Sequence, residues 1–210
     1  MKILSIFLFI VSAGAYAHPV IYQGGWALSS SNMPDYSNNY LMYSPSNRYS
    51  VGIDHWRFSQ EAANTEAALL KINHLLWRDN GENHQANIYL HGGGGVVDQE
   101  WGSPGTHGMY MLGLEADWET RRLYTAIKHY EFHAPGKLDM FTTQARVGFS
   151  PYEADFKSLQ TWFMLQGMII DEVQEKVMIT PMVRFFYNNV LWEMGSSTRG
   201  DWMLNLMVHL

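Results

Sequence analysis

Apolar and polar residues alternate along most of this chain. In the last segment every second residue from Trp202 to Leu210 is apolar, and the residues between them are polar or methionine. The same period of two runs through 107–118, 140–150 and 174–187. This alternation is typical of β-strands, in which successive side chains point to opposite faces, and it does not fit the spacing of a helix. The sequence therefore predicts an all-β protein.

Twelve segments show this pattern, and residues typical of turns separate them. Most segments have the roughly 9–11 residues that a tilted strand needs to cross a membrane. We expect strands at 19–30, 38–46, 48–59, 65–77, 84–97, 107–118, 121–133, 140–150, 156–170, 174–187, 190–197 and 201–210. Their even number predicts a closed antiparallel transmembrane β-barrel of twelve strands, with both of its ends in the periplasm. The connections 98–106 and 134–139 then face outward and are among the longer ones.

The pair Asn188-Asn189 predicts a tight hairpin, because a two-residue turn of the primed type needs residues that tolerate positive φ. Such a turn places Arg184 opposite Glu193 on the polar face. It also places Phe185 opposite Trp192 on the apolar face. Both pairs are of the kind that fixes strand register.

A second hairpin is expected around Thr120-Arg121. It places Trp118 opposite Leu123, both on the apolar face. It also places Glu115 diagonal to Lys128 on the polar face. The two hairpins assign outward and inward faces consistently, which supports the barrel.

The N-terminus has the three parts of a secretory signal peptide. Lys2 precedes an apolar run over 3–12, and a small-residue stretch ends at Ala17. The apolar run is shorter than the roughly 20 residues of a spanning helix, which disfavours a membrane anchor. We expect 1–17 to be the signal peptide and 18–210 to be the barrel.

Composition fits a membrane barrel. Aromatic residues make up 14% of the chain while the mean hydropathy is only −0.20, as expected when strands turn alternate residues toward lipid. We place Trp26, Trp118, Trp192 and Trp202 outward near segment ends, where aromatic girdles lie. The alternative is a soluble periplasmic β-sandwich or lipocalin-like barrel, for which 16% charged residues is a thin surface. The net charge of −6 and the lack of a basic tract disfavour nucleic acid as a partner.

Several stretches resemble an uncharacterised family of small outer-membrane β-barrel proteins of Gram-negative bacteria. They include Gln85-Ala86-Asn87-Ile88-Tyr89, Gly113 to Glu119, and the C-terminal run from Asn189 to Ser197 followed by Gly200 to Asn205. The resemblance spans most of the chain after residue 17 but implies no particular activity. In size and strand number the chain also resembles twelve-stranded monomeric porins. The final Leu210 departs from the terminal aromatic residue that many such barrels carry.

The inward face is where a function of the barrel is expected, and it carries acids and bases in near balance. The predicted lumen or pore-lining residues are Asp54, Lys71, Asn87, His91, Glu115, Asp117, Lys128, Gln144, Arg146, Arg184, Glu193, Asn205 and His209. A strongly selective pore would show rings of one sign. The balanced set is compatible with a weakly selective polar channel and equally with ion pairs that hold a barrel interior together. An open lumen would favour transport, and a filled one would favour a structural or binding role.

A soft-metal site is a second hypothesis, since thioether and imidazole groups suit copper(I) and a terminal histidine can chelate copper(II). The candidates are His18, Met109, Met111, Met203, Met207 and His209. The alternative is that these methionines fill gaps in a core. No cofactor is expected.

Barrel enzymes that hydrolyse lipid or peptide are the alternative from a different class. Asp54-His55, His107 and Ser196-Ser197 are the residues to consider, but their order gives no recognisable nucleophile, base and orienting group. The run Gly92 to Gly95 lacks the Lys-Ser/Thr of a phosphate loop and more plausibly relieves crowding between strands. We therefore expect no catalytic residues. The sequence predicts a monomeric outer-membrane barrel, inserted by the barrel-assembly machinery, that acts as a narrow pore or an envelope protein.

Overall fold

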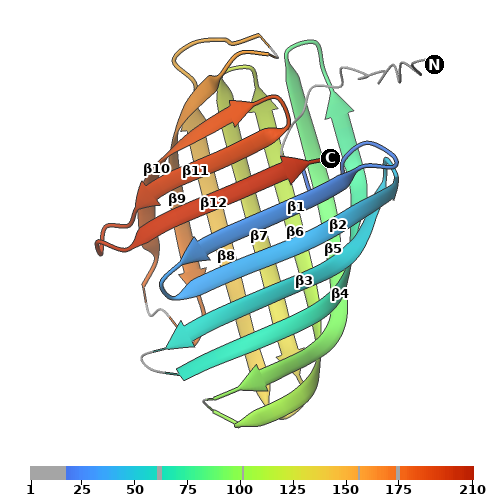
Figure 1. The fold of residues 1–210 in the computed structure, drawn as a ribbon, viewed down its shortest axis with the longest axis vertical. Helices are drawn as coiled ribbons and strands as arrows, with labels where there is room; N and C mark the ends of the chain where they lie inside the picture. Colours follow the sequence, from blue (N-terminus) through green and yellow to red (C-terminus); the bar gives the residue numbers. More distant parts are fainter. Residues whose placement is uncertain (1–17, 61–62, 101, 156, 174–175) are drawn as a thin grey trace, which may run out of the picture.

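The computed structural model describes residues 18–60, 63–100, 102–155, 157–173 and 176–210, so the predicted signal peptide lies outside the described residues. The strands are β1 (Trp26–Met33), β2 (Tyr36–Ser46), β3 (Tyr49–Gln60), β4 (Ala63–Asn80), β5 (His84–Gln99), β6 (Gly105–Thr120), β7 (Leu123–Ala134), β8 (Leu138–Phe149), β9 (Gln160–Ile170), β10 (Met178–Tyr187), β11 (Val190–Ser196) and β12 (Trp202–His209). Each strand pairs antiparallel with the next, and β1 pairs with β12 (Figure 1). The predicted closed barrel of twelve strands is confirmed. No helix among the described residues is long and apolar enough to cross a membrane.

The two ends of the barrel differ in outline. We call the end at which β1 begins and β12 ends the terminal end, and the opposite end the far end. The strands β4, β5 and β6 have 18, 16 and 16 residues, against 8 in β1 and in β12. The hairpin of β4 and β5 extends the terminal end at the top of Figure 1, and the hairpin of β5 and β6 extends the far end at its bottom. The predicted connections 98–106 and 134–139 are shorter than expected, because the strands continue until only 100–104 and 135–137 remain outside them.

The predicted first strand, 19–30, is also wrong at its start. β1 begins only at Trp26, and the residues before it turn into the barrel. Proline at position 19 has no N–H to donate to a ladder, and Gly24 adopts a φ of 84°, which favours glycine. Both features interrupt a strand that the apolar pattern alone would start earlier. The strands predicted from 156 and 174 likewise begin later, at Gln160 and Met178.

The hairpin of β10 and β11 has the predicted register. Arg184 lies opposite Glu193 and Phe185 opposite Trp192, and Asn188 has a φ of 53° in the turn. The prediction for this hairpin is therefore confirmed.

The register predicted for β6 and β7 is wrong by two residues. Trp118 lies opposite Thr125, and Glu115 lies directly opposite Lys128 rather than diagonal to it. The turn is wider than predicted, because β7 begins only at Leu123. A shift of two residues leaves every side chain on its predicted face, since the faces alternate with a period of two.

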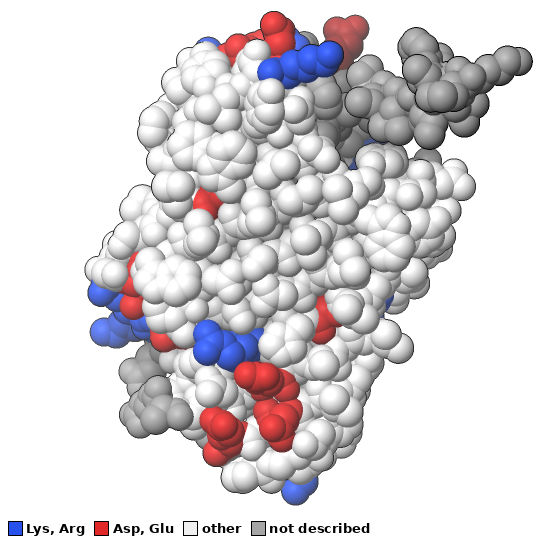
Figure 2. Space-filling view, viewed as in Figure 1, with Lys and Arg blue, Asp and Glu red and all other residues white. Residues whose placement is uncertain are grey.

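The outer surface carries a belt of exposed apolar side chains. Among its most exposed members are Ile53, Leu70, Leu112, Leu114, Ile127, Val147 and Leu204. Figure 2 shows charged residues gathered toward the two ends of this face, with a nearly uncharged middle. A soluble barrel would have its apolar face inside and charges outside, so the soluble alternative does not fit this surface.

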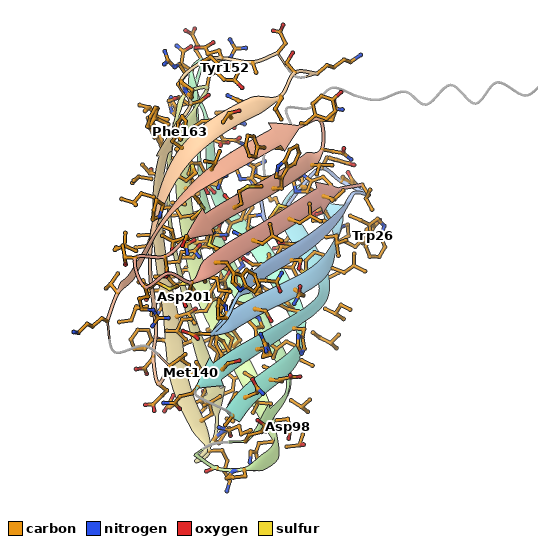
Figure 3. All side chains as sticks on the ribbon, turned by 60° about the vertical axis from the view of Figure 1, so that its left-hand side comes forward. Trp26, Asp98, Met140, Tyr152, Phe163 and Asp201 are labelled. Atoms are coloured by element: carbon orange, nitrogen blue, oxygen red, sulfur yellow. The ribbon has the colours of Figure 1, made fainter. Side chains whose placement is uncertain are left out.

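Aromatic side chains flank the belt at the terminal end. Trp26 packs against Tyr43 with ring centroids 5.0 Å apart, and Phe149 packs against Phe163 at 5.6 Å. Figure 3 shows Trp26 and Phe163 on the outside of the barrel. Such a girdle is typical of the membrane interface, as predicted for Trp26.

Candidate functional site in the lumen

The thirteen predicted lumen residues all lie on the inner face of the barrel. Ten of them are buried, and Lys128, Gln144 and Arg146 line an internal chamber. Their part in transport or binding stays a prediction. The inner residues form three layers: a polar middle layer, an apolar far layer toward the far end, and a terminal layer at the terminal end.

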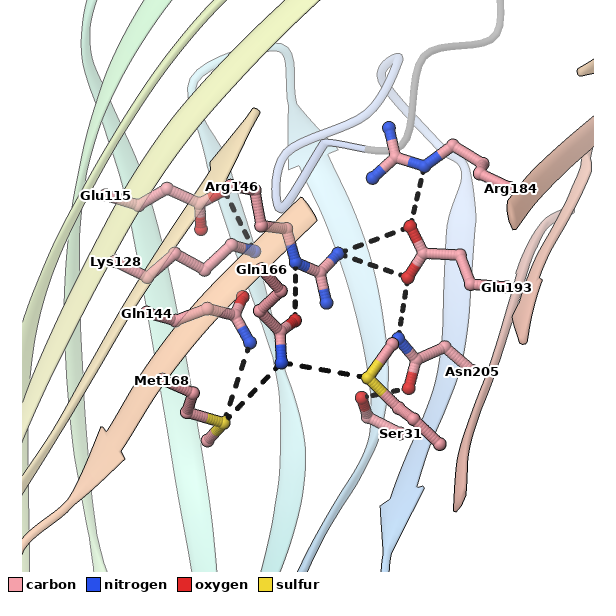
Figure 4. A network of polar contacts seen from close by, with 11 residues as sticks. Ser31, Glu115, Lys128, Gln144, Arg146, Gln166, Met168, Arg184, Glu193 and Asn205 are labelled. Carbon is pink, nitrogen blue, oxygen red and sulfur yellow. Dashed lines mark hydrogen bonds and ion pairs between the residues drawn. The ribbon is translucent and has the colours of Figure 1, made fainter. Parts of the chain in front are cut away.

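The middle layer holds a network around one buried carboxylate. Glu193 of β11 is 1% exposed and accepts hydrogen bonds from Arg184 Nε at 2.6 Å and from Asn205 Nδ2 at 2.6 Å. Arg146 Nη1 of β8 lies 3.1 Å from the same carboxylate, and Arg146 Nε donates to Gln166 Oε1 at 2.9 Å (Figure 4). Side chains of β8 to β12 thus meet across the lumen. A buried carboxylate with this many donors is held in its ionised form.

Two further ion pairs complete the middle layer. Lys71 Nζ lies 2.7 Å from Asp54 Oδ2, and both side chains are nearly fully buried. Lys128 Nζ lies 3.0 Å from Glu115 Oε1. His91 lies between these two pairs, with Nδ1 2.7 Å from an oxygen of Asn73 and Nε2 3.5 Å from Glu115 Oε2. Cations and carboxylates in this layer therefore neutralise each other locally rather than forming a ring of one sign.

Aromatic rings surround the ammonium group of Lys71. Its Nζ lies 5.0 Å from the ring centroid of Tyr130, 5.6 Å from Trp56 and 5.7 Å from Tyr40. Attraction between a cation and the face of a ring adds to the ion pair with Asp54. The ring of Tyr130 fits because position 113 is glycine: a Cβ there would lie 2.3 Å from Tyr130 Cδ1.

The far layer is apolar. One cluster of buried hydrophobic residues fills this part of the lumen, and most of its members come from strand segments near the far end. Trp56 and Phe58 of β3 pack edge to face against Phe132 of β7, with centroids 5.0 and 5.4 Å apart. Most of the thirteen methionines of the chain lie here as well. They are Met33, Met109, Met111, Met140, Met164, Met168, Met178, Met182 and Met203. The alternation along the chain predicted a polar lumen throughout, and for this layer the prediction is wrong.

The terminal layer is built around residues 18–21, which lie inside the mouth of the barrel. The carbonyl of Pro19 accepts hydrogen bonds from Ser50 Oγ at 2.8 Å and from Asn73 Nδ2 at 3.4 Å. Val20 is 1% exposed and forms a cluster with two inner residues, Leu75 of β4 and Tyr89 of β5. Period-two reasoning assigned this segment to a strand and therefore missed its place in the lumen.

Arg78 and Glu119 also belong to the terminal layer, and both were missed. The register of β4 against β5 shifts between Leu75 and Trp77, and this bulge turns Arg78 inward, where its Nε donates to Asn87 Oδ1 at 2.6 Å. Glu119 was assigned to a turn. It continues the inward series of Glu115 and Asp117, so its alternation was a usable signal.

The chamber between the layers is small. It has a volume of about 100 Å³, and its lining includes Lys71, Lys128, Arg146, Arg184 and Tyr124. A water molecule needs on the order of 10–15 Å³ of such space, so the chamber has room for several waters. Passage of a larger solute would require side chains to move.

The predicted metal candidates are divided among the three layers. Both ring nitrogens of His18 lie near carboxylates, with His209 close enough to His18 for the two rings to interact electrostatically. Met207 lines the chamber, whereas Met109, Met111 and Met203 belong to the apolar cluster. Within the part of the chain that the structure describes, no group of three or more His, Cys, Asp or Glu side chains is placed to hold a metal ion.

The residues considered for hydrolysis are also separate from one another. Asp54 points into the lumen toward Lys71, whereas the neighbouring His55 points outward and lies 3.5 Å from Glu66. Ser197 Oγ is engaged within its own turn, 3.1 Å from Asp201 Oδ2. Among the described residues, Asp54, His55 and Ser197 therefore do not pair with one another.

The glycine run 92–95 lies in β5. A Cβ at Gly95 would lie 2.0 Å from the carbonyl oxygen of Ala68, so the neighbouring strand approaches too closely for any side chain. By contrast, a Cβ at Gly94 would meet open space. The predicted relief of crowding therefore applies to Gly95 and not to the whole run.

No protein-family profile and no curated protein matches this sequence. Among solved structures, the chain is similar to the KdgM porin in complex with disordered oligogalacturonate, at 12% identity and a TM-score of 0.48, over 88% of this chain and 97% of the porin. It is also similar to CdiB from Acinetobacter baumannii, at 9% identity and a TM-score of 0.31, over 89% of this chain and 59% of CdiB.

Proposed function

We propose that the protein is a monomeric outer-membrane barrel that works as an envelope protein with a small polar binding chamber, and not as an open pore. The exposed apolar belt and its aromatic girdle support the membrane location. Insertion by the barrel-assembly machinery, after removal of the leader by signal peptidase, is part of the same proposal.

The filled lumen is the observation that carries this proposal. The chamber of about 100 Å³ lies between an apolar cluster toward the far end and residues 18–21 at the terminal end. The ion pairs in the middle layer leave little net charge to attract ions of one sign. Both features favour a structural or binding role.

Planar lipid bilayers test the proposal. We expect the purified barrel to give no current steps above background at neutral pH, while a general diffusion porin in the same membrane conducts. Reproducible steps would support a narrow pore instead. In that case Glu193→Gln, which leaves Arg146 and Arg184 without their carboxylate, should shift the reversal potential toward anions.

Binding of a soft metal is a second candidate, and the placement of the methionines favours it. Met178 lies opposite Met168, and Met182 opposite Met164, on the inner faces of β9 and β10. Gln166 Nε2 lies 3.9 Å from Met168 Sδ and 3.7 Å from Met203 Sδ, so the two sulfur atoms flank one amide. Thioethers suit copper(I), although they also fill cores well.

Calorimetry with silver(I), a redox-stable substitute for copper(I), tests whether the methionines bind a metal or only fill the core. The variant Met168→Leu/Met178→Leu keeps nearly the same side-chain volume and should abolish a saturable heat. Met194→Leu, on the outward face, is the matched control and should bind as the wild type does. Equal binding by all three proteins would exclude these methionines as ligands.

A further inference from the structure

His18 is held at the terminal mouth of the lumen by two carboxylates of β6. Its Nδ1 lies 3.6 Å from Asp117 Oδ2, and its Nε2 lies 3.4 Å from Glu119 Oε1. Nε2 also lies 3.3 Å from Gln85 Oε1. Both ring nitrogens therefore face acceptors, and only the imidazolium form of histidine donates from both.

The mouth carries more negative charge than the imidazolium neutralises. Asp117 accepts a hydrogen bond from Asn87 Nδ2 at 2.6 Å. Glu119 Oε1 is buried, and its contact with His18, at 3.4 Å, is the contact found for it among the described residues. Arg78 is the nearby cation of β4, and its guanidinium is bonded to Asn87 and the Tyr89 hydroxyl. The single Nε2 proton of His18 is shared between Glu119 and Gln85, so the two buried carboxylates have room for an additional cationic donor.

Cleavage after Ala17 would create such a donor at this place. Hydrolysis adds one water across the bond between Ala17 and His18: the leader leaves with a new carboxylate, and His18 gains an α-amino group, which takes up a proton near neutral pH. The new ammonium is separated from the imidazole only by Cα and Cβ. It carries up to three N–H donors close to the carboxylates that already hold the ring.

We propose that Asp117 and Glu119 form a binding site for the processed amino terminus of this chain, which closes the terminal mouth once the leader has been removed. The ligand is a doubly positive N-terminal histidine, recognised through its ammonium and imidazolium groups together. The carbonyl of Pro19 and the side chain of Val20 anchor the residues that follow. The site rests on the predicted cleavage and not on whether the lumen conducts.

The electrostatics of the mouth agree with this assignment. Burial alone would lower the pKa of His18, but Asp117 and Glu119 outweigh it and raise the pKa from 6.5 to about 9. The other groups that contact the ring of His18 are Gln85 and Tyr89 of β5, and His209 of β12 interacts with it electrostatically. Binding of the His18 ring to Asp117 and Glu119 is therefore strongest below pH 6.5, the ordinary histidine pKa, and weakens as the pH rises through 9.

Amine labelling of the purified, folded protein tests the site. Intact mass first shows whether the chain begins at His18. The protein is then treated with an acylating N-hydroxysuccinimide ester at pH 7.5, and peptide mass spectrometry follows the α-amine alongside Lys137 and Lys157, which are exposed. A free α-amine has the lower pKa and should react faster than either lysine.

We expect the α-amine to react at least about sixfold more slowly in the folded protein than in the urea-unfolded one, since a rise of one unit from an α-amine pKa of about 7.7 lowers the free base at pH 7.5 from about 40% to about 6%. Asp117→Asn/Glu119→Gln should remove this protection. Glu153→Gln, which alters an exposed acid paired with Arg121, should keep it. A difference in mobility between unheated and heated samples in SDS gels verifies folding. Glu119→Gln alone serves if the double variant does not fold.

Three results would overturn the proposal. They are a chain that begins elsewhere than at His18, an α-amine that labels as fast folded as unfolded, and protection that survives the loss of both carboxylates. None of them depends on conductance. The occluded lumen is therefore tested separately by the bilayer experiment.

Discussion

Replacing Glu193 with Gln is the sharpest test of the middle layer. The carboxylate is 1% exposed and lies between Arg184 Nε at 2.6 Å and Arg146 Nη1 at 3.1 Å. Gln keeps the shape but removes the charge, so two buried guanidinium groups lose their counter-ion. Breaking a buried pair in this way costs about 3–5 kcal/mol. The amide oxygen still accepts one hydrogen bond, so we expect a value near the lower end of this range.

The measurement is urea-induced unfolding from phospholipid vesicles, followed by tryptophan fluorescence. Glu153→Gln is the control, because its partner Arg121 lies at the surface and exposed pairs contribute about 0–1 kcal/mol. Adding Arg184→Gln to Glu193→Gln should recover part of the lost stability, since one unpaired charge is then removed. Equal costs for Glu193→Gln and Glu153→Gln would refute the view that this network organises the lumen.

Three further predictions concern packing, the lipid-facing surface and pH. Gly113→Ala should lower the free energy of unfolding by about 1–3 kcal/mol, because its Cβ would meet the ring of Tyr130 at 2.3 Å, whereas Gly94→Ala should be tolerated. Leu114→Arg places a charge on the apolar belt and should cost about 2–4 kcal/mol in vesicle refolding, or less if this position lies near an interface. The NMR titration of His18 should show a pKa near 9 in the wild type. The stability that the protonated ring of His18 adds is then complete below pH 6.5 and is lost as the pH rises through 9. A pKa of His18 at the ordinary histidine value of 6.5 would contradict this prediction.

Alternation along the chain was sufficient to predict the barrel and its two faces, because a period of two is imposed by the strand itself. It was less informative about register. In the β6–β7 hairpin Glu115 could be set diagonal to Lys128 or directly opposite it without any side chain changing face. What decides between these registers is the conformation of the turn, and its residues Arg121 and Arg122 carry no strong preference for one turn type.

The polar lumen residues were predictable individually, but their partners were not. Glu193 could be matched with Arg184 because the two share a hairpin. Its contact with Arg146 crosses the lumen from β8, and no local pattern reports which inner side chains are long enough to meet there. The bulge that turns Arg78 inward changes the phase of β4 and is likewise invisible to a strict period of two.

The apolar far layer follows from a reversal of the alternation within single strands. In β3 the outward residues change from apolar Val51 and Ile53 to His55, while the inward residues change from Asp54 to Trp56. The first part of β3 thus has the pattern of a membrane strand, with apolar residues outside and polar residues inside. The second part has the pattern of a soluble protein, with apolar residues inside and polar residues outside. A strand that leaves the bilayer must make this change, because its outer face then meets water.

The same reversal occurs in β7, whose outward face changes from Ile127 to Glu131 while its inward face changes from Lys128 to Phe132. The change occurs in both strands, and Trp56 of β3 packs against Phe132 of β7, so we infer that the far end of the barrel projects beyond the apolar belt and has a water-facing exterior. Its interior must then supply an apolar core of the kind that a soluble protein needs, since no lipid covers these strand ends. The rings of Trp56 and Phe132 meet there for that reason, so the packing that stabilises the projecting strands is also what closes the lumen at the far end.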